Sequence, residues 1–460
     1  MNMNKNTMIE GLARESYEKG GFNGAWLYAE NGAIVSKGCM GFRDPGNTLP
    51  ITEDSIFQLA SISKTFTAAA VMLLMRQDLL SPEDEITKFF PEIPYPGVTV
   101  RHLLNHTSGI PDYFDDADWF IRIWKDEKRV PGNDEILRFL CETKAQAYFA
   151  PGEGLHYSNT GYNLLALLVE RISGIPYEEF LQKNIFELAG MTSTRCCHIR
   201  RDGVPFENYA QATVFEEGRY VADVDSKEDG DVVAFDGLNG DDYVYTNLFD
   251  MFRWDMALRE GSVLTPEEQL LMYTPGKLNN GEDAAYDEEY GLGYGFGWGV
   301  GRDEDLGLVV SHSGGMPGVA TWFERFIDAD RVLIFLCNRE RMDARAFWSF
   351  ESALEAIARD KEPGPVRCIE DVVIKDPDKS KWESFCGKYE HPEDAEFIIE
   401  EIFMKDGDLW ATALDEDGDS LSFRLYPVGE DEFGRKGGML DLRFGDGCVI
   451  YDDLTCKKLS

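Results

Sequence analysis

The sequence lacks the usual marks of a metal site and of a disulfide framework. Its nine cysteines contain no C-x-x-C pair, and together with only six histidines they form no zinc-ligand spacing. The odd count leaves at least one thiol unpaired in a monomer, and the adjacent Cys196 and Cys197 are awkwardly placed to bond each other. Reduced thiols are typical of cytosolic proteins. We therefore expect a cytoplasmic protein without a zinc site.

Long apolar stretches are lacking as well. Residues 1–10 contain no apolar h-region, so we expect no signal peptide. The longest apolar run near the N-terminus, residues 68–75, is far shorter than the roughly 20 residues that a membrane-spanning helix needs. We therefore expect no membrane span.

Positive charge is scarce. The chain has 45 Lys and Arg residues against 84 Asp and Glu residues, which gives a formal net charge of −39. Such a surface repels nucleic acids and anionic membranes, and it accommodates a neutral or cationic ligand more easily. The same charge also keeps any soluble protein dispersed, so it says little about the substrate. We expect no nucleic-acid and no membrane partner, and the sequence leaves the oligomeric state open.

The length and composition that are present predict two domains. The chain has 460 residues, too many for one ordinary core, and 43% of them are hydrophobic. The K-E-P-G-P segment at residues 361–365 is typical of a linker. We predict a large domain over residues 1–360 and a small all-β, barrel-like domain over residues 366–460. The strand-like runs of the second domain are residues 396–403, 409–414, 420–426, 440–444 and 449–451.

The large domain has the pattern of an α/β fold. A hairpin is predicted around Asn31-Gly32, and a second one turns near residues 329–330. We expect the two hairpins to lie side by side in one antiparallel sheet, flanked by helices and accompanied by a helical lobe. Helical periodicity predicts helices at residues 65–77, 161–173, 177–189 and 249–258. The acidic, Gly-rich residues 214–242 are predicted to form a loop.

An S-x-x-K motif is formed by Ser61 and Lys64 where a loop enters the helix predicted at residues 65–77. A spacing of three residues on a helix puts both side chains on one face. Lys64 can then take the proton that Ser61 must lose to become a nucleophile. The helix N-terminus also favours the negative charge that develops there. A serine cap followed by a surface lysine would give the same letters, so the motif alone leaves both interpretations open.

A second candidate element is the Y-x-N motif of Tyr157 and Asn159. A tyrosine beside an ammonium group can act as a general acid or base, and an asparagine amide can hold a substrate carbonyl. A loop tyrosine followed by a helix cap is the structural alternative. Tyr245 and Asn247 repeat the same spacing. We prefer Tyr157 because a P-G-E-G turn introduces it and a strong helix follows.

The third element is the run His312, Ser313, Gly314 and Gly315. It precedes a predicted strand, so we expect it at a sheet edge, where small residues let the backbone approach a ligand closely. A backbone N–H near Gly315, together with that of Ser61, would make an oxyanion hole. The structural alternative is a Gly-rich turn with an exposed histidine.

The order S-x-x-K, Y-x-N and H-x-G along the chain is far more specific than any one motif. With it the chain resembles the serine β-lactamase-like superfamily, and most of all the branch of class C β-lactamases, DD-carboxypeptidases, D-aminopeptidases and family VIII esterases. The resemblance covers about residues 8–357 and extends more loosely to the tail. Supporting segments are F-Q-L-A at residues 57–60, L-L-N-H-T-S-G-I at 103–110, P-G at 151–152 and Y-G-F-G-W at 294–298.

This resemblance implies roles for individual residues. Ser61 would be the nucleophile, Lys64 its proton partner and Tyr157 the second proton carrier, while Asn159 would contact the substrate. His312 stands where many relatives have the lysine of a K-T-G motif. A largely neutral histidine anchors a carboxylate less firmly than lysine does, which disfavours β-lactam hydrolysis and D-Ala-D-Ala recognition. His106, in the H-T-S-G segment, would be structural.

The expected reaction is acyl transfer to Ser61 and then to water, with no metal or organic cofactor. The expected substrate is a small acyl ester, an amide or a D-amino-acid peptide. An acyltransferase that uses the same site is an alternative, because only the acceptor differs. A β-lactamase, or a penicillin-binding or sensing protein without efficient turnover, is another.

Overall fold

The computed structural model describes residues 4–204, 206–216, 219–227, 230–287, 291–340, 342–390, 398–414, 420–436, 441–445, 447–451 and 454–459. The chain forms two compact units. Unit 1 holds Met1–Thr7 and Asn23–Glu340, and unit 2 holds Met8–Phe22 and Arg341–Ser460. Unit 2 thus takes in residues of the predicted large domain, and the boundary at residues 360–366 stays a prediction.

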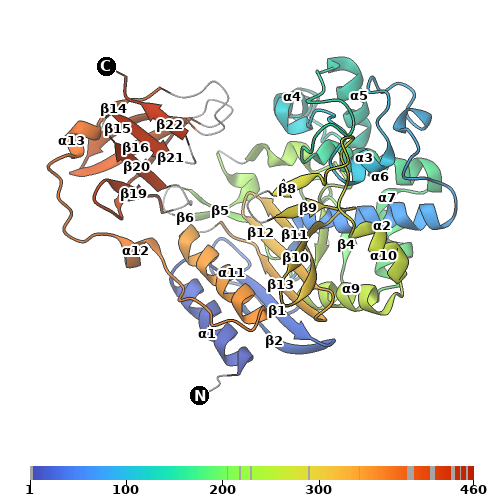
Figure 1. Ribbon diagram of the computed structural model, residues 1–460, viewed down its shortest axis with the longest axis horizontal. Helices are drawn as coiled ribbons and strands as arrows, with labels where there is room; N and C mark the ends of the chain where they lie inside the picture. Colours follow the sequence, from blue (N-terminus) through green and yellow to red (C-terminus); the bar gives the residue numbers. More distant parts are fainter. Residues whose placement is uncertain are drawn as a thin grey trace. The chain divides into compact units, whose positions relative to one another are not determined.

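An eight-stranded antiparallel sheet is the centre of unit 1, in the order β2-β1-β13-β12-β11-β10-β9-β8 (Figure 1). Its strands are β1 (Gly24–Glu30), β2 (Ala33–Met40), β8 (Ala285–Asp287), β9 (Leu292–Tyr294), β10 (Gly299–Asp303), β11 (Gly307–Met316), β12 (Val319–Phe326) and β13 (Arg331–Cys337).

The two hairpins pair with each other as expected. β1 runs antiparallel to β13, with Gly24 opposite Cys337 and Glu30 opposite Arg331. Asn31 and Gly32 turn the first hairpin with φ of 52° and 72°, the left-handed values that an Asn-Gly pair adopts most easily. Chain segments from opposite ends of unit 1 therefore share one sheet, and the predicted antiparallel sheet is confirmed.

Helices flank this sheet and form the lobe beside it. Helix α6 packs against α2, α3 and α5, and the apolar stripe of α2 is buried, for example at Phe66, which packs on Trp254 with ring centroids 4.9 Å apart. The helices are α2 (Ser63–Arg76), α3 (Val100–Leu104), α4 (Ala117–Glu127), α5 (Asn133–Thr143), α6 (Asn159–Ser173), α7 (Tyr177–Leu181), α8 (Ile199–Asp202), α9 (Leu248–Glu260) and α10 (Pro266–Met272). Helix α7 continues as a π-helical turn, Gln182–Phe186, so the long helix predicted at residues 177–189 is interrupted.

Two smaller sheets complete unit 1. One has the order β3-β7-β4, from β3 (Phe57–Gln58), β4 (Arg195–Cys196) and β7 (Val244–Thr246). The other is the hairpin of β5 (Thr213–Glu216) and β6 (Arg219–Ala222). This hairpin lies in the segment predicted to be a loop, so that prediction is wrong for those strands. Cross-strand pairing outweighs the low strand propensity of the acidic residues around it.

Unit 2 combines helices with a small all-β region. It contains most of α1 (Lys5–Glu18), then α11 (Ala344–Ala358), α12 (Ile369–Val372) and α13 (Trp382–Phe385). Ser16 Oγ donates a hydrogen bond of 2.8 Å to the Ala346 carbonyl and so joins α1 to α11.

The C-terminal part of unit 2 is built from two antiparallel sheets, which confirms the predicted all-β region (Figure 1). Phe385 and Phe444 stack in its core with ring centroids 4.3 Å apart. Residues 396, 397 and 440, at the start of two predicted strands, lie outside the described residues. The strands are β14 (Gly387–Lys388), β15 (Ile398–Lys405), β16 (Asp408–Leu414), β17 (Ser420–Arg424), β18 (Tyr426–Pro427), β19 (Glu432–Gly434), β20 (Asp441–Gly445), β21 (Cys448–Tyr451) and β22 (Leu454–Lys457).

Among the described residues, no helix is both long and apolar enough to span a membrane. All nine cysteines lie in the described part of the chain, and none of them forms a disulfide.

Candidate active site

Ser61 lies in a short 3-10 turn, Ala60–Ile62, that runs directly into α2. Ala60 just before it has a left-handed φ of 49°, which costs a non-glycine residue conformational energy. The turn therefore presents Ser61 half-buried at the start of a helix that is buried from Ser63 to Leu74. The S-x-x-K motif is thus on a turn-to-helix junction, as its pattern predicts.

Lys64 is the residue that joins the predicted motifs. Its ammonium nitrogen Nζ lies 3.0 Å from Ser61 Oγ and 2.8 Å from Asn159 Oδ1, and it donates a third bond of 3.0 Å to the Asp241 carbonyl. Its side chain is completely buried, so it is not a surface lysine. The S-x-x-K and Y-x-N motifs, 95 residues apart at Lys64 and Asn159, therefore meet at one nitrogen atom.

Burial changes the pKa of Lys64. It lowers the pKa of the ammonium group, because a charged amine loses its hydration inside the protein, and the nearby carboxylates of Asp241 and Asp242 work against this shift. A lysine with a lowered pKa is neutral more often near neutral pH. It can then accept a proton from a neighbouring hydroxyl.

Tyr157 is the second neighbour of the nucleophile. Its phenol interacts with Ser61, and Lys64 Nζ lies 4.8 Å from the centre of its ring. Burial raises the pKa of the phenol well above its usual value, so Tyr157 keeps its proton. In this state it can donate a proton to a departing group rather than remove one.

His106 packs against the ring of Tyr157. The two rings pack with centroids 4.3 Å apart, and His106 Nδ1 accepts a bond of 3.1 Å from the Ser158 N–H. His106 is fully buried, and burial lowers the pKa of its imidazole well below the usual value, so the ring is neutral. Its contacts are those of a structural residue that holds the Tyr157 loop.

Asn159 begins α6 but does not cap it. Ser158 is the N-cap, and its side chain accepts from the Gly161 N–H. The Asn159 amide is therefore available to accept from Lys64, while its backbone N–H donates a 2.5 Å bond to Asp112. Asp112 thereby fixes the start of the helix that carries Asn159.

The second Y-x-N motif lies elsewhere in unit 1. Tyr245 is in β7, fully buried, and its hydroxyl has no hydrogen-bond partner in the described part of the chain. Asn247 is the N-cap of α9, where its side chain accepts from Asp250. The Tyr157 pair, not this one, is beside Ser61.

His312, Ser313, Gly314 and Gly315 occupy β11, which pairs with β10 on one side and β12 on the other. The ladder between β10 and β11 covers only Gly307 to Ser311, so residues 312–315 pair with β12 and have no ladder partner on their other side among the described residues. They therefore lie at a sheet edge, as expected. His312 is buried, so it is not the exposed histidine of a turn, whereas Ser313 and Gly315 are exposed.

His312 is held as a neutral imidazole. Its Nδ1 lies 2.6 Å from the Ser313 carbonyl, which only accepts, so Nδ1 carries the hydrogen and Nε2 accepts from the Tyr294 hydroxyl at 2.8 Å. Burial and the nearby Lys64 charge lower the pKa of His312 to about 3. At this position the site therefore offers a neutral group near pH 7.

Gly314 lets β11 approach the nucleophile turn. A Cβ atom there would lie 2.1 Å from the Leu59 carbonyl oxygen and 2.2 Å from Thr321 Oγ1, so no larger residue fits. Thr321 Oγ1 donates a 2.7 Å bond to the same carbonyl. The strand is thus fixed against the segment that leads into Ser61.

Several groups around Lys64 were not predicted from the sequence. Asp241 supplies the carbonyl that binds Lys64, and its carboxylate accepts from Tyr113 and Asn163. Tyr294 fixes the tautomer of His312. These residues come from separate segments and share no spacing. The one sequence signal that could have indicated any of these residues was the Y-G-F-G-W segment, which contains Tyr294.

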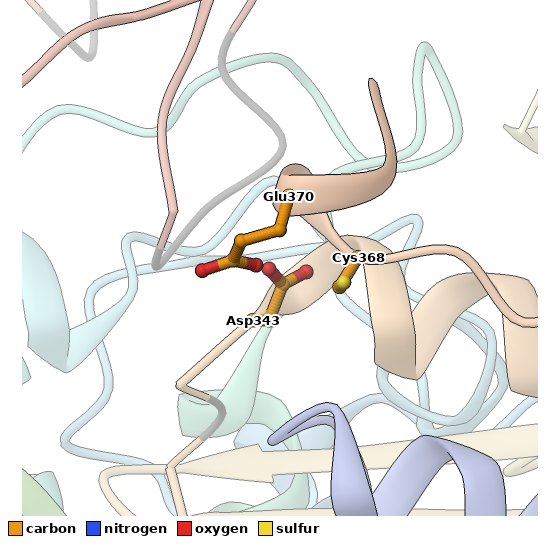
Figure 2. Close-up of side chains that lie close together, drawn as sticks. All are labelled: Asp343, Cys368 and Glu370. Atoms are coloured by element: carbon orange, nitrogen blue, oxygen red, sulfur yellow. The ribbon is translucent and has the colours of Figure 1, made fainter. Parts of the chain in front are cut away.

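A separate cluster in unit 2 brings Asp343, Cys368 and Glu370 within 4.8 Å of one another (Figure 2). Each group already has a protein partner. The Asp343 carboxylate accepts from the Ala346 and Ile369 N–H groups and so caps two helices. Cys368 Sγ bonds Asp371, and Glu370 pairs with Lys436. These contacts account for the cluster without an ion.

Comparison with known proteins identifies the family of this chain. The Beta-lactamase family model matches residues 9–354. Penicillin-binding protein 4* of Bacillus subtilis is 38% identical over 342 residues, which cover 74% of this chain and 73% of that protein.

Two solved structures share the fold at lower identity. The octameric penicillin-binding protein homologue of Pyrococcus abyssi superposes with a TM-score of 0.67 at 22% identity and covers 98% of this chain and 99% of its own. D-amino acid amidase of Ochrobactrum anthropi SV3, complexed with D-phenylalanine, gives 0.63 at 23% identity and covers 78% of this chain and 100% of its own. The chain belongs to the Beta-lactamase family, within the serine β-lactamase/transpeptidase superfamily.

Proposed function

We propose that this protein is a serine hydrolase that forms an acyl-enzyme at Ser61. One observation carries the proposal: Lys64 Nζ is shared between Ser61 Oγ at 3.0 Å and Asn159 Oδ1 at 2.8 Å. A proton acceptor with a lowered pKa is thereby held against the Ser61 hydroxyl. Perturbed lysines in such contacts are typical of catalytic sites.

Acylation follows from these contacts. Neutral Lys64 takes the proton of Ser61 Oγ as that oxygen bonds to the acyl carbon, and the carbonyl oxygen gains the negative charge. The N–H groups of Ser61 and Gly315 bind that oxyanion. The bond to the leaving group then breaks, and the Tyr157 phenol gives the leaving group a proton. Lys64 then returns a proton to Tyr157.

Deacylation uses the same groups in reverse. A water molecule gives its proton to Lys64 and bonds to the acyl carbon. Ser61 Oγ then leaves with a proton, the acid is released, and the free enzyme returns. Asn159 holds the substrate carbonyl region during both steps. General acid–base transfer of this kind contributes roughly 100-fold to 10,000-fold to the rate.

The proposed substrate is a small acyl ester, an amide or a D-amino-acid peptide. Neutral His312 gives no cation for a substrate carboxylate, which argues against dependence on a free C-terminal carboxylate. The name of the D-amino acid amidase that shares the fold supports amides of D-amino acids. We place the protein in the cytoplasm, since its nine cysteines form no disulfide.

A second candidate is a penicillin-binding protein with slow turnover. The name of the relative that is 38% identical favours it. The two candidates share acylation at Ser61 and differ in deacylation. An acyltransferase shares it as well and differs only in the acceptor.

Labelling with a fluorophosphonate, followed by intact-mass spectrometry, tests the proposal. The wild-type protein should take one label, and Ser61→Ala should take none. Ser63→Ala is the matched control, because Ser63 stands two residues further on, at the start of α2, and its side chain accepts a bond from the Val244 N–H. This variant should label fully. Full labelling of folded Ser61→Ala would remove Ser61 from the mechanism.

Turnover of three chromogenic substrates then separates the candidates. We expect kcat/KM for p-nitrophenyl acetate and for D-alanine p-nitroanilide to exceed that for a cephalosporin. A penicillin-binding protein with slow turnover would instead give a stoichiometric burst and little release afterwards. Efficient cephalosporin hydrolysis with ester turnover near background would reverse the substrate assignment.

A further inference from the structure

The carboxylate of Asp242 lies close enough to Lys64 and Tyr157 to interact with both electrostatically, and only one of its two oxygens has a hydrogen-bond partner among the described residues. Asp242 follows the residue whose carbonyl binds Lys64. Its Oδ1 accepts from Gln58 Nε2 at 3.2 Å and from the Tyr243 N–H at 2.5 Å. Its Oδ2 has no hydrogen bond within the described residues and is not sealed from solvent, since the side chain keeps 8% of its surface exposed.

The other two carboxylates near Lys64 have both oxygens occupied. Asp112 accepts from Phe114 on Oδ1 and from the start of α6 on Oδ2. Asp241 accepts from Asn163 on Oδ1 at 2.6 Å and from Tyr113 on Oδ2 at 3.0 Å. Asp242 alone among the three thus keeps an oxygen for a ligand.

The cation on the far side of Gln58 does not neutralise Asp242. Arg200 pairs with Asp223 and, at 3.1 Å, with Asp236, and it reaches only the Gln58 carbonyl oxygen, at 3.2 Å. In the described part of the chain Asp242 takes part in no ion pair. Gln58 instead turns its amide nitrogen towards Asp242 Oδ1 and Met316 Sδ, the latter 3.0 Å away.

A buried carboxylate without a cation costs stability, because water solvates the charge better than the protein does. Burial and the neighbouring Asp241 accordingly raise the pKa of Asp242 to about 6. Near pH 7 the carboxylate is nonetheless charged. Together with a neutral His312, this carboxylate makes the site an acceptor for positive charge.

We propose that Asp242 binds the protonated amino group of the substrate, so that the preferred substrates are aminoacyl esters, amides or peptides with a free amino terminus. This inference rests on the proposed acyl-enzyme at Ser61. An ammonium group donates hydrogen bonds and carries the charge that Oδ2 lacks. A neutral acyl group would leave Oδ2 unpaired, and a carboxylate would be repelled by it. The net charge of −39 also draws cations towards the molecule.

The test compares two substrates that differ only at the amino group. D-Alanine p-nitroanilide is cationic and N-acetyl-D-alanine p-nitroanilide is neutral there. We expect the wild-type protein to prefer the cationic substrate at least 10-fold in kcat/KM. Asp242→Asn keeps the shape and the Gln58 contact but not the charge, and it should reduce the preference to about 2-fold or less, mainly through a higher KM.

Controls separate this role from a structural one. Asp242→Glu keeps the charge and should restore part of the preference. Asp134→Asn removes the same charge from an exposed position in α5 and should leave the preference unchanged. A thermal melt should show that Asp242→Asn is folded, so that a lost preference does not come from a damaged structure.

The outcomes distinguish the two levels of the argument. Wild-type protein that labels at Ser61 and hydrolyses the neutral ester, yet shows no preference for the cationic substrate, overturns the role of Asp242 alone. The same holds if Asp242→Asn keeps the preference. Wild-type protein that neither labels at Ser61 nor hydrolyses either kind of substrate overturns the proposed function, and the role of Asp242 with it.

Discussion

Two segments of this chain have the same Y-x-N spacing and different surroundings. Tyr157 and Asn159 stand at the start of α6, where Lys64 bonds Asn159 and lies over the Tyr157 ring. Tyr245 and Asn247 stand at the start of α9, where the tyrosine is in the core and the asparagine caps the helix. The spacing itself places a tyrosine just before a helix and an asparagine at its first turn.

The difference shows where the chemistry of the first motif comes from. A tyrosine hydroxyl in an apolar core has nothing to exchange a proton with, whereas one beside a buried amine and a serine does. Lys64, which belongs to another segment of the chain, supplies that surrounding. Six variants test this comparison, from the largest expected effect to the smallest.

Lys64→Met removes the group that makes the surroundings of the first Y-x-N motif different from those of the second. We expect kcat/KM for p-nitrophenyl acetate to fall roughly 1,000-fold to 10,000-fold, because Ser61 loses its proton acceptor. Fluorophosphonate labelling should slow in parallel. A thermal melt must show that the variant is folded. Labelling at the wild-type rate would mean that the base is another group.

Tyr157→Phe and Tyr245→Phe delete the same hydroxyl from the two motifs. The first should lower kcat/KM by roughly 100-fold or more, since the leaving group loses its proton donor. The second should change kcat/KM by about 2-fold at most and leave stability unchanged or raised, because its hydroxyl is buried without a partner. Equal losses in steady-state kinetics would refute the distinction.

Asp242→Asn sharpens the comparison, because Asp242 is the site residue in the segment that leads into Tyr245. Burial raises its pKa from an ordinary 3.8 to about 6, with Asp241 adding to the shift and Lys64 opposing it. The folded state therefore holds the proton more tightly than the unfolded chain, so wild-type stability falls as pH rises from about 4 to 6.

Removing that charge should stabilise the protein at pH 7.5 by about 1–3 kcal/mol, and the gain should vanish near pH 4. The ionisable groups that interact electrostatically with Asp242 include Asp241, Lys64, Tyr243, Tyr113, Tyr157 and Cys196, and Arg200 lies behind Gln58. Urea unfolding at the two pH values measures the difference. A variant that is less stable at pH 7.5 and equally so at pH 4 would contradict this electrostatic cost.

Asn159→Ala and Asn247→Ala should have opposite consequences. Asn159→Ala should reduce kcat/KM about 10-fold or more with little effect on the melting temperature. Asn247→Ala removes an N-cap and should cost about 1 kcal/mol of stability while the kinetics stay unchanged. Thermal melts and kinetics on the same samples decide, and an activity loss confined to Asn247→Ala would reverse the assignment.

Local pattern predicted much of this fold. Apolar runs around Asn31-Gly32 and the helical stripe of α2 are short-range signals, and both elements appear with bounds close to those predicted. The pairing of β1 with β13 followed from placing two hairpins in one sheet. The β5–β6 hairpin was missed because acidic residues disfavour strands locally, and only its partner strand stabilises it.

The residues of the site also divide into those that the local sequence predicts and those that it does not. Ser61, Lys64, Tyr157 and Asn159 lie in motifs whose spacing is visible in the sequence. Asp241, Asp242 and Tyr294 act through contacts that tertiary structure alone creates. His312 lies at the predicted sheet edge, but its contact with Tyr294 of β9 depends on tertiary structure, which no local pattern near residue 312 predicts.

The acyl-enzyme itself gives the most direct test of the central claim. Wild-type protein is mixed with p-nitrophenyl acetate, quenched in acid during the burst, digested and mapped by mass spectrometry. We predict an acetyl group on Ser61, in an amount equal to the burst of p-nitrophenol, and its absence in Lys64→Met at the same time. A burst with the acetyl group on another residue, or turnover without any acetylated serine, would contradict the account.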